Sequence, residues 1–144
     1  MNTQTNAIQG ENETSANQTT SKALIWTGRV ISTLVVLFML MDGVMKLVKP
    51  APVMEATARL GFPESALTII GVVLLVCTIL YAIPRTAVFG AILLTGYLGG
   101  AVATQVRAGS SLFETLFPVI FGVLVWSGIF LRDSRLRAMI PLRR

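Results

Sequence analysis

The run Leu34-Val-Val-Leu-Phe-Met-Leu-Met41 is uncharged and apolar throughout, and it lies within a mostly apolar segment, residues 23–48. A helix needs about 20 predominantly apolar residues to cross the core of a bilayer. Backbone amides inside that core have no water to bond, so such a run is expected to be helical. Three more runs of this kind follow, at residues 66–83, 86–106 and 112–131. The sequence therefore predicts an all-α membrane protein with four transmembrane helices in a bundle.

The overall composition favours the same class. Of the 144 residues, 53% are hydrophobic and 13% are charged, whereas a soluble domain carries about 25% charged residues. A domain of this length has too little interior to bury four such runs away from water. We expect residues 22–144 to form one transmembrane domain in contact with the lipid bilayer. Residues 1–21 are rich in Asn, Thr, Gln and Ser, which predicts a disordered polar tail.

Two connections limit how the spans are arranged. Pro84-Arg85 is a very short turn, which makes the second and third spans antiparallel neighbours. The first loop, residues 49–65, is longer and contains three prolines. Within this loop, Val53-Met-Glu-Ala-Thr-Ala-Arg-Leu60 predicts about two turns of surface helix.

The basic residues predict the orientation. The net charge is +5, and four spans place both termini on one side. The terminal side holds Lys22, Arg29, Arg85, Arg132, Arg135, Arg137, Arg143 and Arg144. The other side holds Lys46, Lys49, Arg59 and Arg107. Because the side richer in Lys and Arg faces the cytoplasm, both termini are predicted to be cytoplasmic. No aromatic-basic patch accompanies these charges, so nucleic acid is not an expected partner.

Several kinds of chemistry are excluded or unsupported. The chain contains no histidine, which rules out a His-ligated haem, a His-bearing zinc site and a Ser-His-Asp triad. Cys77 is the single cysteine, so no intramolecular disulfide forms. Nucleotide-binding loops, metal-ligand clusters and nucleophile–base sets are not recognisable. We expect no metal and no catalytic residue.

Asp42 is the most informative single residue, because it lies inside the first span. It precedes Lys46 by four positions, so the two side chains share a helix face and can pair. A carboxylate within a membrane is a functional candidate, and the alternative is an ion pair that fixes the helix near the outer interface. Gln105, Arg107 and Glu114 lie around the third loop, at the same predicted side. These five residues form a candidate polar site for an anion or a quinone headgroup; the alternative is a solvated rim.

The third span carries a stripe of small residues. Gly96, Gly100 and Thr104 recur at four-residue spacing and therefore lie on one helix face. Such a face lets two helix backbones approach closely. We favour tight packing within the bundle, and a homo-oligomer interface is the alternative.

Five stretches of the chain carry recognisable motifs: Asp42-Gly-Val-Met-Lys46, Leu60-Gly-Phe-Pro-Glu64, Cys77-Thr-Ile-Leu-Tyr-Ala-Ile-Pro-Arg-Thr86, Leu94-Thr-Gly-Tyr-Leu-Gly-Gly-Ala-Val-Ala-Thr104 and Leu131-Arg-Asp-Ser-Arg-Leu-Arg137. In these stretches the chain resembles the DoxX-like family of small bacterial membrane proteins. The resemblance implies a four-helix protein of the bacterial cytoplasmic membrane. It also implies a link to thiosulfate:quinone oxidoreduction or to complexes with soluble redox enzymes, with quinone as the one candidate cofactor.

The chain departs from the pattern that the resemblance implies at three positions. From the resemblance we expect a glutamate where Leu74 stands, and histidines where Gln105 and Glu114 stand. Our first hypothesis is therefore a non-catalytic subunit or anchor that docks a soluble redox protein. The alternatives are a quinone- or thiosulfate-linked oxidoreductase subunit with an outer-rim pocket, and a small carrier of an anion or lipid.

Overall fold

The computed structural model describes residues 2–133 and 136, with side chains described from Lys22 onward. It contains five helices and, within the described residues, no strand. They are α1 (Asn2–Val48), α2 (Ala51–Arg59), α3 (Glu64–Ala82), α4 (Ala87–Arg107) and α5 (Leu112–Arg132). Four segments are long and apolar enough to cross a membrane: Lys22–Val48, Glu64–Ala82, Ala87–Arg107 and Leu112–Arg132. The predicted all-α, four-span, multi-pass membrane fold is confirmed.

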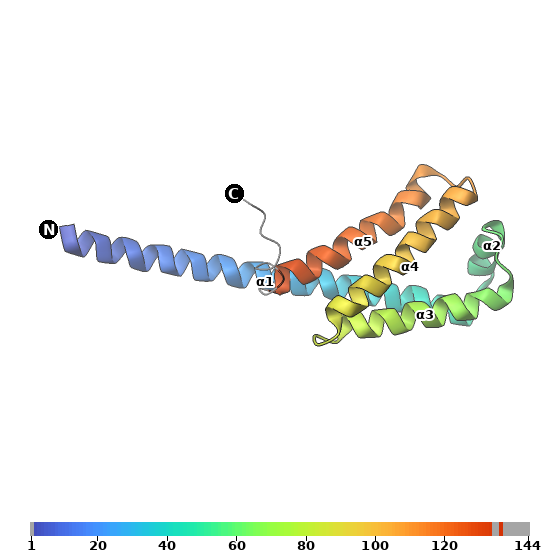
Figure 1. Ribbon diagram of the computed structural model, residues 1–144, viewed down its shortest axis with the longest axis horizontal. Coiled ribbons are helices and arrows are strands. Elements are labelled where there is room, and N and C mark those ends of the chain that lie inside the picture. The colour runs from blue at the N-terminus through green and yellow to red at the C-terminus, as the bar shows by residue number, and fades with distance from the viewer. Residues whose placement is uncertain (1, 134–135, 137–144) are drawn as a thin grey trace.

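The N-terminal segment lies outside the four candidate spans. The backbone of residues 2–21 continues α1 as a helix, and the disorder of this polar segment stays a prediction from its composition. Figure 1 shows this part of α1 extending beyond the bundle.

The four long helices pack in a ring. α1 contacts α3 and α5, and α4 contacts the same two helices from the other side (Figure 1). The start of the α1 span and the end of α5 meet at one end, since a Cβ at Gly28 would lie 2.8 Å from the backbone nitrogen of Arg132. The short helix α2 lies at the opposite end (Figure 1), as the turn-rich loop predicts.

Tyr81 fixes three helices together in the core. Its hydroxyl donates to the carbonyl oxygen of Val125 on α5 at 3.0 Å, and it lies 3.2 Å from Ser32 Oγ on α1. Both Tyr81 and Ser32 are buried. A polar group in an apolar interior is stable there only when it is hydrogen-bonded, and this network satisfies that requirement.

Glycines bring the helices into close contact at several crossings. A Cβ at Gly43 would lie 2.7 Å from Leu75 Cδ2, and one at Gly71 would lie 3.1 Å from the carbonyl oxygen of Gly43. A Cβ at Gly128 would lie 2.5 Å from Ser32 Oγ. Helices in lipid associate through such close packing rather than through the hydrophobic effect. The side chains on the outer faces are apolar, as lipid contact requires; Leu34, Ile69 and Val123 are examples.

Candidate functional site: a cavity beside α2

A cavity of about 530 Å³ lies among the helices at the end of the bundle that carries α2. Every helix contributes to its wall: Phe38 from α1, Thr57 from α2, Ile70 from α3, Tyr97 from α4 and Phe117 from α5. Ligand-binding pockets usually measure about 300–1,000 Å³ and combine apolar walls with a few polar groups. The size and lining of this cavity therefore fit a small molecule.

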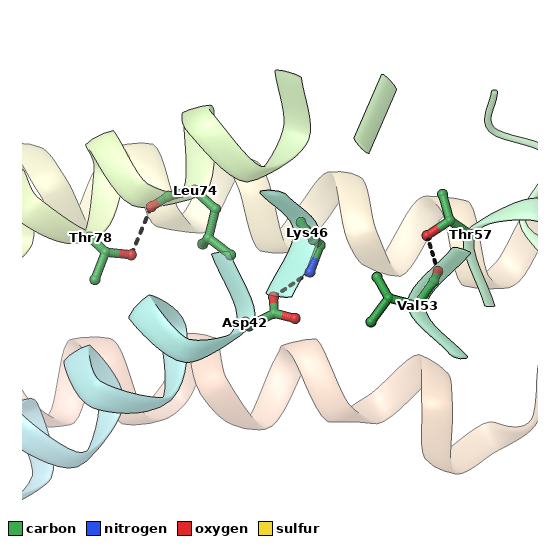
Figure 2. Close-up of polar contacts among 6 residues, drawn as sticks. All are labelled: Asp42, Lys46, Val53, Thr57, Leu74 and Thr78. Atoms are coloured by element: carbon green, nitrogen blue, oxygen red, sulfur yellow. Dashed lines mark hydrogen bonds and ion pairs between the residues drawn. The ribbon is translucent and has the colours of Figure 1, made fainter. Parts of the chain in front are cut away.

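Asp42 and Lys46 form the charged part of the wall. Lys46 Nζ donates to Asp42 Oδ2 at 2.5 Å, one turn along α1, as the spacing predicts. Figure 2 shows the two side chains pointing toward each other. Gly71 explains why Lys46 can lie against α3, since a Cβ at Gly71 would lie 3.0 Å from Lys46 Cβ. The pair is an ionic contact within the site, and the two charges compensate each other.

Neutral polar groups complete the wall. Gln105 and Tyr97, both on α4, line the cavity, and neither side chain makes a hydrogen bond to any described residue. The hydroxyl of Thr57 donates to Val53 O at 2.8 Å within α2 (Figure 2). The Tyr97 hydroxyl and the Gln105 amide therefore remain available, as donors and as acceptors, to a bound molecule.

The other two residues of the predicted polar site lie elsewhere. The guanidinium of Arg107 donates to the carbonyl oxygen of Leu60 at 3.3 Å and ties the end of α4 to the loop after α2. Glu114 forms a capping box with Ser111 at the start of α5: its Oε2 accepts from the Ser111 backbone N–H at 2.9 Å. Arg107 therefore holds a loop in place, and Glu114 caps a helix. The structure therefore brings Asp42, Lys46 and Gln105 to one cavity, and does not bring Arg107 and Glu114 to its wall.

The stripe of small residues lines this cavity as well. A Cβ at Gly96 or Gly100 would meet no atom within 4 Å, and both glycines face the cavity together with Thr104. Tight packing of these glycines against another helix of the same chain is therefore not observed. They make room in the cavity instead, and the homo-oligomer interpretation stays a prediction.

Leu74, Gln105 and Glu114, the three positions where the family resemblance leads us to expect other residues, lie in different surroundings. Leu74 is fully buried and lies in the main core cluster, where its carbonyl oxygen accepts from the Thr78 hydroxyl at 2.7 Å (Figure 2). Gln105 lines the cavity and Glu114 caps α5. Among the described residues, no group of three His, Cys, Asp or Glu side chains is placed to hold a metal ion.

Sequence reasoning missed two parts of the cavity wall. The first is Tyr97, which directly follows Gly96 in the stripe of small residues. A large side chain with a hydroxyl in this stretch could have indicated a contribution to the site. Phe113, Phe117 and Phe121 recur at four-residue spacing on α5, and this aromatic stripe was the other. Phe117 and Phe121 line the cavity, and their ring centroids are 5.0 Å apart.

The fold and the cavity define a four-span membrane protein with an internal site between its helices. The chain belongs to the DoxX-like family, whose family model matches residues 30–128. That range includes each cavity-lining residue, from Phe38 to Phe121. Searches of curated proteins and of solved structures found no match to the chain.

Proposed function

We propose that this DoxX-like protein is a non-catalytic membrane subunit of a redox complex, and that its cavity holds a neutral amphiphile of the quinone class. The observation that carries this proposal is the cavity wall, which combines aromatic side chains with a charge-balanced set of polar groups. A quinone has a flat ring, two carbonyl acceptors and an apolar tail. Each of these parts has a chemical counterpart in the wall.

The polar groups suit carbonyl acceptors. Lys46 has donor capacity beyond its single bond to Asp42, and the Tyr97 hydroxyl and Gln105 amide are unengaged donors. Phe38, Phe117 and Phe121 supply aromatic surface for the ring. Aromatic rings pack favourably in offset or tilted arrangements.

The charge balance argues against an anion as the main ligand. Asp42 is within bonding distance of the ammonium group of Lys46, so the cavity offers an anion no uncompensated cation from this pair. Arg107, the other cation of the predicted site, does not line the cavity and donates to the carbonyl oxygen of Leu60. This favours the quinone hypothesis over thiosulfate binding or anion transport.

The role as a subunit that docks a soluble redox protein stays a hypothesis from the family resemblance. Most of the basic C-terminal segment that would contribute to docking lies outside the described residues. Its charge suits either a soluble partner or anionic lipid.

The test is purification of the tagged full-length chain in a gentle detergent, followed by mass spectrometry of bound proteins and of extracted quinone. We expect quinone in near-equimolar amount, together with a soluble redox protein. Bound quinone without such a protein would support the proposed ligand and contradict the proposed role as an anchor. A preparation that holds neither, and that binds no added quinone, would contradict the proposal.

A further inference from the structure

A second hollow runs along the outside of the bundle between α1 and α5. Its lining is almost entirely apolar, and it consists of Ile31, Leu34, Val35, Leu37, Phe38, Met41, Phe121 and Leu124. We call it the α1/α5 groove. Leu34, Leu37 and Met41 are more than half exposed, so the groove is open to the surrounding lipid.

The groove and the cavity share two residues. Phe38 and Phe121 line both, and their rings are stacked with centroids 4.4 Å apart and an interplanar angle of 25°. The two hollows thus meet at this pair of side chains, one from each helix. Aromatic side chains move by rotation about two torsions, without any displacement of the helices.

The length of the groove matches an apolar tail. Residues 31 to 41 of α1 extend about 15 Å at a rise of about 1.5 Å per residue, which is half of a hydrocarbon core about 30 Å thick. A chain lying in this groove therefore stays at a depth where lipid surrounds it. Asp42 directly follows Met41, so the polar part of the cavity begins where the groove ends.

From this geometry we propose that the α1/α5 groove is the lateral portal of the cavity. A ligand enters from the bilayer between Phe38 and Phe121, its ring passes to Lys46 and Tyr97, and its apolar tail remains in the groove. This rests on the proposed function and adds the class of ligand: a molecule with a single polar ring and a long apolar tail. A tail-less ring needs the cavity alone.

The test compares two quinones on the full-length protein in phosphatidylcholine nanodiscs. One probe is a tail-less benzoquinone, and the other has the same ring with a decyl tail. The variant Leu34→Trp/Leu37→Trp fills the groove with bulky side chains on a lipid-facing surface. Its matched control is Val30→Trp/Val44→Trp, at residues that are also about half exposed on α1 but line neither hollow.

We expect the groove variant to bind the tailed quinone at least about tenfold more weakly than the control does, with the tail-less quinone unchanged. Unchanged affinity for the tailed probe would show that its tail does not bind in the groove, and this would overturn the proposed portal. Equal losses of affinity for both probes would also overturn it. A tail-less quinone occupies only the cavity, so substitutions in the groove should not change its affinity. Failure of the native chain to bind either probe would instead overturn the proposed function itself.

Discussion

The hydroxyl of Tyr81 donates to the carbonyl oxygen of Val125 across 3.0 Å, and this bond joins α3 to α5 inside the bundle. A hydrogen bond between membrane helices contributes about 0.6 kcal/mol on average, and up to about 1.7 kcal/mol. The same hydroxyl also contacts Ser32 Oγ. We therefore expect Tyr81→Phe to lower the free energy of unfolding by about 1 kcal/mol, measured by denaturation in detergent. Tyr97→Phe is the control, since the Tyr97 hydroxyl bonds to no described residue; equal stabilities of the two variants would contradict the role of Tyr81.

Gly90 lies at a close crossing of α3 and α4. A Cβ there would lie 2.5 Å from Tyr81 Cα and 2.7 Å from the Leu80 carbonyl carbon, and backbone atoms cannot rotate away. Overpacking of this kind costs about 1–3 kcal/mol. We expect Gly90→Ala to destabilise the bundle by about this amount, measured by thermal unfolding. In the control Gly96→Ala, the new Cβ meets open space, so stability should be unchanged or slightly higher; similar losses for both variants would refute the crossing.

The Asp42–Lys46 pair should behave as a coupled unit. Removal of one partner leaves the other charge without compensation inside the membrane domain, and this costs more than removal of both. We expect Asp42→Asn and Lys46→Met each to destabilise the protein, and the double variant to lose less than the two single losses combined. A double-mutant cycle measures the coupling, which we expect at about 1 kcal/mol. Additive losses would show that the pair is too well solvated to matter.

The orientation of the chain is open to a direct test. The distribution of basic residues predicts that a reporter fused after Arg144 is active only if it functions in the cytoplasm. We expect activity from a cytoplasm-specific reporter at that position and none from a reporter that requires the outer side. The reverse pattern would place the α2 end, and the cavity with it, on the cytoplasmic side.

The four spans were predictable because length and apolar content alone decide whether a segment crosses a bilayer. The helix in the first loop was predictable from the periodic pattern of its residues. The face of each helix that packs against the other helices could not be predicted in the same way. A membrane helix is apolar toward lipid and apolar toward its neighbours, so the pattern does not say which face is buried. Gly96 and Gly100 suggested a packing face, but the close crossings in the structure involve Gly71 and Gly90.

Only the part of the candidate site that lies within one helix could be predicted from the sequence. Asp42 and Lys46 pair because a four-residue spacing fixes their geometry within one helix. Whether Gln105, Arg107 or Glu114 joins them depends on the rotation of α4 and α5, which the sequence does not fix. The pattern around Ser111 and Glu114 does read as a helix start, and this explains where the Glu114 carboxylate is used.

The central claim is that the cavity beside α2 binds a quinone-like amphiphile, and Gly100 offers the most direct test. Gly100 lines the cavity and Gly99 does not, yet a Cβ at either residue would meet no atom within 4 Å. The measurement is the affinity of a tailed quinone for Gly100→Leu and Gly99→Leu in nanodiscs. The account predicts a loss of at least about tenfold for Gly100→Leu and native affinity for Gly99→Leu. Native affinity for both variants would show that the ligand binds outside this cavity.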